Sequence, residues 1–520
     1  MKPTQTVAGR AALVLVLAAL LPSGRASTYG QAAEGAPAEA LTAIKKEFLV
    51  TPDEAQEWHR YKDQGGPAFS GNASWHRMMS LVEGELRKAG VVDLTRNRWS
   101  FDLWSTTEWP DDSGWKLVSG GSPVQVAHYG AWSGATGADG ITAQLLLYDP
   151  AKPPPVRDLE GKIVVFTTAP HPRAPLDDTY RTWFTLNDYE YRSDSETFGP
   201  LFTPLSVGES VSYDVWWQLR QTAKINATLK QARAAGGIIV FDMPYERVAG
   251  LYTFPVPTLY QAPTLYLDRV AGRKVIEDAR KGAAATLTLL AAVKPAETHQ
   301  LIGYLPGKHY GTDKDETILL RTHTDGPAIS QENGALGVLA IIRYFSHIPQ
   351  AQRPRTLMVY LDNRHYMPGM EPAFEAQDWF VLHPEGRRRI AGLIAVEHLG
   401  QMEFKEVGDA MVATGRVEPS FLWTRNDQGL IDKAIQAVKD HHWPRVQVQS
   451  VERPGTHGGK QGVWYGMGRL GMEWNLPTFS TMGAQGAYWA TSARLDRFDK
   501  QLFVTQVAAM AQLTGVLMTR

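Results

Sequence analysis

The sequence predicts an α/β protein with a mostly parallel central sheet flanked by helices, together with a segment of a different character. From residue 298 onward, apolar strand-like runs alternate with helical segments, a rhythm typical of a largely parallel sheet covered on both faces. Residues 122–296 have a different character, with short apolar runs separated by Pro- and Gly-containing turns. The chain has 520 residues, which is more than one compact domain usually needs.

Composition excludes several functional classes. The chain carries 53 Lys plus Arg against 54 Asp plus Glu, and this balance lacks the basic excess of a nucleic-acid-binding protein. It has no Cys, which excludes disulfide scaffolds, zinc–thiolate sites and Cys nucleophiles. Neither a phosphate-binding loop nor a G-x-S-x-G serine elbow is present. Any metal must therefore be held by the 14 His residues and by carboxylates.

Residues 1–26 are predicted to be a secretory signal peptide. Lys2 and Arg10 precede an apolar run over 11–21, and small residues follow it. The run is shorter than the roughly 20 residues that a membrane-spanning helix needs. We therefore expect an exported protein, periplasmic or secreted, with no membrane span after signal cleavage.

Residues 27–121 are expected to hold a polar leader and the start of the catalytic domain. Helices are predicted over 52–61 and 72–89. The second helix begins at a cap-like Asn72, carries apolar residues at helical spacing and ends near Gly90.

Residues 122–296 are predicted to form a separate domain. Strands are expected over 124–128, 142–148, 163–166, 238–241, 263–267 and 285–290, with a helix over 224–235. The segments 159–165 (L-E-G-K-I-V-V) and 234–242 (A-A-G-G-I-I-V-F-D) resemble the protease-associated (PA) domain. That resemblance implies a mainly β domain that is inserted into the catalytic domain and lies over the substrate entrance of an exported peptidase.

Residues 297–520 are predicted to form the α/β catalytic domain. Strands are expected over 317–321, 356–361, 390–396 and 477–481, and helices over 333–345 and 427–440. In an open α/β sheet, ligands bind outside the carboxyl ends of the strands. The residues that follow each predicted strand are therefore the candidate site.

His and carboxylate side chains follow three of these strands. A catalytic zinc site uses three such ligands and leaves one position open. Each His taken alone is more often an ordinary polar residue, but their convergence favours a metal, most simply Zn²⁺. The candidate ligands are His323, Asp325, Glu332, His365 and His398.

Catalytic groups other than the ligands are predicted from the same strand ends. Glu397 is the first candidate for proton transfer, and Glu371 is the second. Arg364 and Tyr488 are candidates for binding a substrate carboxylate or a developing oxyanion. A surface Arg and a core Tyr are the alternative interpretation.

The segment from residue 301 to the C-terminus resembles the co-catalytic zinc aminopeptidase family, which includes glutamate carboxypeptidase, transferrin receptor and glutaminyl cyclase. The resemblance is carried by residues 323–325 (H-T-D), 332–335 (E-N-G-A) and 355–362 (R-T-L-M-V-Y-L-D). It implies that His323 binds zinc and that Asp325 orients it. Glu332 stands where the family has a bridging Asp.

Two departures from the family pattern predict a rearranged, single-metal site. The family's paired glutamates, one of them the general base, are replaced by residues 362–365 (D-N-R-H). The family's final His ligand has no counterpart in residues 476–489.

The sequence thus predicts an exported metallohydrolase that cleaves a peptide or other amide bond through a metal-bound water. One alternative is a divergent metalloenzyme acting on a glycan or small molecule, as hydrolase, lyase or cyclising transferase. Some of the 16 Trp residues could then stack on sugars. The other alternative is a catalytically inactive binding protein of the same fold. The sequence predicts no oligomeric state.

Overall fold

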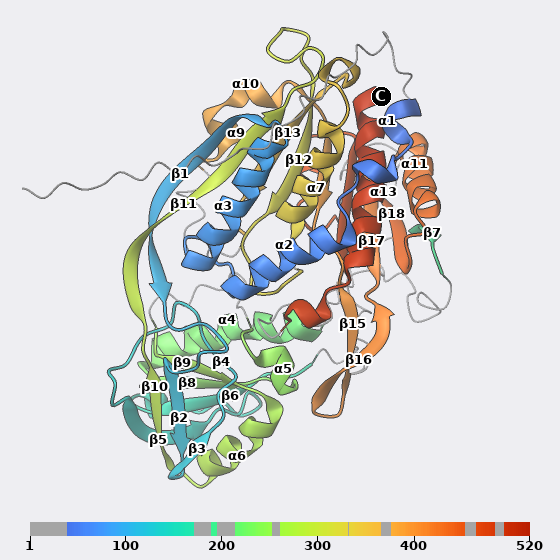
Figure 1. Cartoon of the computed structure of the whole chain (residues 1–520). Helices are drawn as coiled ribbons and strands as arrows, with labels where there is room; N and C mark the ends of the chain where they lie inside the picture. The colour runs from blue at the N-terminus through green and yellow to red at the C-terminus, as the bar shows by residue number, and fades with distance from the viewer. Residues whose placement is uncertain are drawn as a thin grey trace, which may run out of the picture. The chain divides into compact units, whose positions relative to one another are not determined.

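A nine-stranded mixed sheet forms the framework of the candidate site (Figure 1). The computed structural model describes residues 39–170, 189–194, 214–251, 261–330, 332–365, 376–452, 464–483 and 493–520. The strand order is β1 (Val92–Ser105), β11 (Ala292–Leu305), β13 (Thr356–Asp362), β12 (Thr317–His323), β14 (Ile390–Val396), β19 (Thr478–Gly483), β17 (Ser420–Arg425), β18 (Val446–Val451) and β7 (Tyr189–Arg192).

Parallel pairing is concentrated at the centre of this sheet. Strands β13, β12, β14 and β19 run parallel to one another, and β17 is parallel to β18. The outer pairs β1–β11, β11–β13 and β18–β7, and the β17–β19 pair, are antiparallel. The predicted α/β class is confirmed, and β13, β12 and β14 bring their carboxyl ends to one edge.

Long helices cover one face of the sheet. They are α2 (Pro52–Gly65), α3 (Ala73–Lys88), α7 (Gly334–Ser346), α11 (Gln428–Asp440) and α13 (Lys500–Thr519). Caps fix where several of them begin: Thr51 and Glu54 form a capping box, and Asn72 accepts from the Trp75 amide at 2.8 Å. On the opposite face, the short helices α9 (Trp379–Leu382) and α12 (Arg469–Glu473) pack against the sheet, and α10 (Pro384–Arg387) follows α9.

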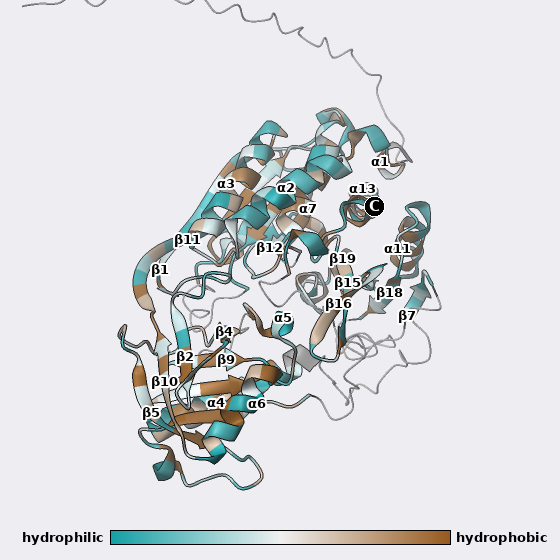
Figure 2. Cartoon of the chain, turned by 60° about the horizontal axis from the view of Figure 1, so that its bottom comes forward, coloured by the Kyte–Doolittle hydropathy of each residue, from teal (hydrophilic) through white to brown (hydrophobic). Residues whose placement is uncertain are grey.

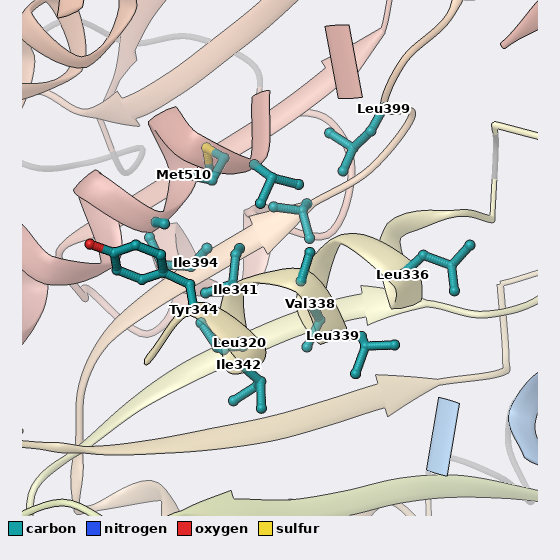
Figure 3. Close-up of a cluster of buried hydrophobic side chains, with 14 of the residues drawn as sticks. Leu320, Leu336, Val338, Leu339, Ile341, Ile342, Tyr344, Ile394, Leu399 and Met510 are labelled. Carbon is teal, nitrogen blue, oxygen red and sulfur yellow. The ribbon is translucent and has the colours of Figure 1, made fainter. Parts of the chain in front are cut away.

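Helix α7 is buried on nearly all sides because it lies between the sheet and other helices. Figure 3 shows Leu336, Val338, Leu339, Ile341 and Ile342 of α7 against residues of β12, β14 and α13. This packing fixes the start of α7, and residues 332–333 with it, next to the ends of β12 and β14.

Helix α13 has the length and apolarity of a membrane span, which the sequence interpretation did not identify. Within it, 78% of the most apolar 18-residue window is buried in the protein. It packs against α2, α7, α11 and β14. Among the described residues, α13 is the helix that meets this criterion, and its burial is that of a core helix.

A second, eight-stranded sheet is formed from residues that lie between β1 and β11 in sequence. Its order is β3 (Ser122–Val124), β2 (Trp115–Ser119), β10 (Ala284–Leu289), β5 (Ile141–Leu147), β6 (Ile163–Thr167), β8 (Gly236–Val240), β9 (Thr264–Leu267) and β4 (His128–Tyr129). Helices α4 (Asp214–Ala232), α5 (Tyr245–Val248) and α6 (Arg269–Arg280) belong to the same stretch. Figure 2 shows its strands in the hydrophobic colour, in keeping with a buried core of their own.

The chain enters and leaves this second sheet through the paired strands β1 and β11. One strand from the intervening sequence, β7, instead pairs with β18 of the first sheet. The PA-domain resemblance and the predicted domain limits stay predictions.

A hairpin of β15 (Met402–Val407) and β16 (Ala410–Val417) follows the loop that carries Glu397 and His398. Glu406 of this hairpin forms ion pairs with Arg247 of α5 (2.9 Å) and Arg269 of α6 (2.6 Å).

Candidate metal centre

Three neighbouring strands deliver the candidate ligands to one edge of the first sheet. His323 is the last residue of β12, and it lies opposite Asp362, the last residue of β13. Glu397 and His398 directly follow β14, which pairs with β12 on its other side. The sequence placed His323 and His398 among the ligands and Glu397 as the group for proton transfer, and the structure brings these three side chains to one edge.

His323, Glu397 and His398 form a buried group of metal-ligand type. One potential ligand atom of each lies within 4.8 Å of the others. His323 Nε2 is 3.6 Å from Glu397 Oε2, and His398 Nε2 is 4.0 Å from the same oxygen. Ligands about 2.0–2.1 Å from a tetrahedral zinc are about 3.3 Å apart. To reach that spacing, Glu397 Oε2 would have to come about 0.3 Å closer to His323 Nε2 and about 0.7 Å closer to His398 Nε2.

The imidazole protonation states suit a metal as well. His323 Nδ1 lies 2.9 Å from the backbone carbonyl of Asp325, which can only accept, so Nδ1 carries the proton and Nε2 presents a lone pair. Burial lowers the pKa of His323 to about 4 and that of His398 well below its usual range. Both rings are neutral at pH 7, which is the form that binds metals.

The Glu397 carboxyl is held by a glycine turn. Its Oε1 accepts from the Met467 amide, and a Cβ on Gly466 would lie 2.5 Å from that oxygen. Gly466 has φ +72°, a conformation that favours glycine. Burial raises the pKa of Glu397 to about 7, although the Met467 hydrogen bond opposes the shift. Oε1 is thereby fixed, and Oε2 faces the two imidazoles.

His398 has an uncommon backbone conformation for a residue with a side chain. Its φ is +58°, in the left-handed region. The adjacent Leu399 is clamped by Asn333: the Asn333 amide donates to Leu399 O (2.7 Å), and its oxygen accepts from Leu399 N (3.0 Å). Such strained residues persist where surrounding contacts hold them, often at functional sites.

His365 and Asp325 lie beside this group. The His365 ring centroid is 4.3 Å from that of His323, and the His365 amide donates to Asp325 Oδ1 at 3.3 Å. Burial, reinforced by the neighbouring imidazoles, lowers the pKa of His365 well below its usual range. Asp325 is buried and supports His323 through its backbone oxygen.

Glu332 has a different nearest partner. Its Oε1 pairs with Lys62 Nζ of α2 at 2.5 Å, and both side chains are buried. It is not a member of the group defined by His323, Glu397 and His398. Burial raises the pKa of Glu332, and Lys62 opposes this effect.

Arg364 is compensated by two carboxylates. It lies 2.6 Å from Asp362 Oδ2 and 2.5 Å from Asp378 Oδ2. Burial alone would raise the pKa of Asp362, but Arg364 and Arg321 outweigh it and hold the pKa below its usual range. Tyr360 donates to Asp378 at 2.5 Å, which extends the network. The other two predicted groups, Tyr488 and Glu371, lie outside the described residues.

Sequence reasoning missed the residues that position the group. Lys62, Asn333, Gly466 and Met467 act through long-range contacts. Only Asn333, next to Glu332 in the E-N-G-A segment, lay within a segment that the sequence had singled out.

Comparison with solved structures identifies the fold. A peptidase M28 precursor from Shewanella amazonensis aligns with a TM-score of 0.59 and 14% identity over 93% of this chain and 97% of that chain. BSAP, a zinc aminopeptidase from Bacillus subtilis, gives 0.55 and 12% over 91% and 96%. An aminopeptidase from an Aneurinibacillus species gives 0.52 and 13% over 92% and 95%.

The chain has the fold of the zinc aminopeptidases. The fold predicted from the H-T-D and E-N-G-A segments is thereby confirmed. No model of a known protein family matches the sequence, and no curated protein matches it. These structural matches are 12–14% identical to this chain, so they establish the fold alone.

Proposed function

We propose that this protein is an exported, divalent-metal-dependent hydrolase of peptide or other amide bonds. His323, Glu397 and His398 would hold the metal, most simply Zn²⁺, with His365 adjacent. The observation that carries the proposal is the convergence of these buried groups, two imidazole nitrogens within 4.0 Å of one carboxylate oxygen. Their place at the carboxyl ends of parallel strands supports it.

A divalent metal at such a site polarises a carbonyl and acidifies water. Other groups of the protein orient the three proposed ligands. The Asp325 carbonyl fixes the His323 tautomer, and the Met467 amide fixes the Glu397 carboxyl. Burial lowers the pKa of both histidines and keeps them neutral.

Glu397 is assigned here as a ligand, because its Oε2 faces both imidazoles. The sequence had placed it first as a general base, and its pKa of about 7 also suits proton transfer at neutral pH. Glu397→Gln separates the two roles. Loss of metal together with activity indicates a ligand, whereas retained metal with lost activity indicates a base.

The test combines metal analysis with a substrate panel. The purified mature protein should contain divalent metal by mass spectrometry. His323→Ala and His398→Ala should lower metal affinity by more than the roughly 10–100-fold that loss of an orienting partner costs. His309→Gln is the matched control, because His309 lies in the loop before β12, outside the group. Metal content that is negligible, or equal in all variants, would refute the proposal.

Aminoacyl amides, peptides, oligosaccharides and N-terminal glutaminyl peptides form the panel. Metal-dependent cleavage of the amides or peptides supports the hydrolase, turnover of only the other compounds supports a divergent metalloenzyme, and inertness supports a binding protein. Export is tested separately by sequencing the mature N-terminus, which should begin near residue 27.

A further inference from the structure

A buried lysine is connected to the candidate metal centre through the residues at the start of α7. Lys62 of α2 has only 3% of its side chain exposed. Its ammonium pairs with Glu332 and donates to the Ala328 carbonyl at 2.7 Å. Removing both charges from water carries a desolvation penalty that the attraction between them often fails to recover. Stability alone is therefore a poor reason for this pair.

The pair is coupled to the loop that carries His398. Glu332 precedes Asn333, which holds both backbone groups of Leu399. His59, three residues before Lys62 on α2, lies with its Nε2 3.0 Å from the Asn333 amide nitrogen. One face of α2 thus supports the start of α7 and, through it, the metal-binding loop.

The two oxygens of Glu332 are in different situations. Oε1 is taken by Lys62. Oε2 is buried and makes no hydrogen bond of standard geometry within the part of the chain that the structure describes, while the backbone amides of Ala328 and Glu332 lower the pKa of the carboxyl and so favour its charged form. The carboxylate is therefore arranged with a fixed protein cation on one side and an oxygen left over on the other. In the family that the sequence resembles, this position carries the Asp that bridges two metals.

We propose that the Lys62 ammonium acts as a built-in second cation, so that the site holds one exchangeable divalent ion per chain instead of two. Lys62 neutralises Glu332, and its fixed charge repels a further cation from that carboxylate. This inference rests on the proposed function, since it presupposes the ion held by His323, Glu397 and His398.

Zinc titration of the metal-stripped full chain tests the inference, with stoichiometry measured by calorimetry and by mass spectrometry after dialysis. The wild type should bind one equivalent. Lys62→Met should bind two, because Glu332 then needs another cation. Two equivalents in the wild type would overturn the inference and leave the proposed function intact. Zero equivalents would overturn the proposed function itself.

Lys62→Met leaves the buried carboxylate of Glu332 without its cation, and this variant could fail to fold. A second set of variants tests the inference in that case. Glu332→Gln leaves the ammonium uncompensated and should weaken binding of the single zinc at least about tenfold by electrostatic repulsion. The double variant Lys62→Met/Glu332→Gln removes both charges and should restore one equivalent at near wild-type affinity. Equal affinity in Glu332→Gln and the wild type, or a folded Lys62→Met that still binds one zinc, would overturn the inference.

Discussion

Replacing Asn333 by alanine should damage the centre from a distance. The side chain makes three buried hydrogen bonds, two to the Leu399 backbone and one to His59. At about 1 kcal/mol net each, these amount to about 3 kcal/mol, and the stranded Leu399 N–H and C=O raise the expected loss to about 3–5 kcal/mol. Because Leu399 adjoins His398, zinc affinity should also fall by about tenfold or more.

Urea denaturation of the metal-free protein measures the first effect, and zinc titration measures the second. Asn97→Ala is the matched control. Asn97 also makes two side-chain hydrogen bonds, to Gln300 (3.0 Å) and to the Gln377 carbonyl (2.7 Å), but water can replace them because the site is partly exposed. The control should lose less than about 1 kcal/mol. A loss in Asn333→Ala no larger than in Asn97→Ala would refute the assignment of Asn333 as a positioning residue.

Three further substitutions probe other parts of the structure. Gly466→Ala, which pushes a Cβ against Glu397, should lower zinc affinity about tenfold or more, whereas Gly408→Ala, also at positive φ but with open space around it, should not. Equal zinc affinities would contradict the role given to the glycine turn. Burial lowers the pKa of His128 to about 3, so the unfolded chain takes up a proton below pH 6.5 that the folded chain does not. Stability is therefore lost as the pH falls, and the loss between pH 7 and pH 5 should be about 2 kcal/mol smaller in His128→Phe by urea midpoints. If the stability of His128→Phe depends on pH as that of the wild type does, the assignment of this effect to His128 is wrong. Arg364→Lys keeps the charge but not the paired contacts, and should lose about 2 kcal/mol of stability with zinc content unchanged; loss of zinc instead would place Arg364 in the centre.

Local sequence signals were sufficient for helices α2, α3, α4, α7 and α11 and for four strands of the nine-stranded sheet, β12, β13, β14 and β19. Asn72 and Asp427 cap α3 and α11 where the sequence predicted helix starts, and the apolar runs 317–321, 356–361 and 390–396 became β12, β13 and β14. The sequence interpretation did not include α13 or the remaining strands of this sheet, β1, β11, β17, β18 and β7. Helix α13 is apolar on nearly all sides and therefore lacks the alternating pattern of an amphipathic helix.

In the candidate site, too, some residues could be predicted from the sequence and others could not. His323 and His398 were named as ligands, and Glu397 as a general base, because each follows an apolar run that predicts a strand and parallel strands place their carboxyl ends at one edge. The order of these strands in the sheet came only from the structure. The partner of Glu332 was not readable in this way. Lys62 lies 270 positions earlier, in helix α2. In the sequence, this buried lysine cannot be distinguished from the polar residues of the same helix that are exposed.

The sequence by itself determined which residue types could hold a metal and which strand ends would carry them. The absence of Cys and the placement of His after apolar strands are properties of the sequence, and they do not depend on how the side chains pack. Only the tertiary structure decided how those groups are held: the Gly466 turn beneath Glu397, the Asn333 clamp on Leu399, and the Lys62 ammonium against Glu332. These depend on contacts between distant segments, which periodicity and spacing do not encode.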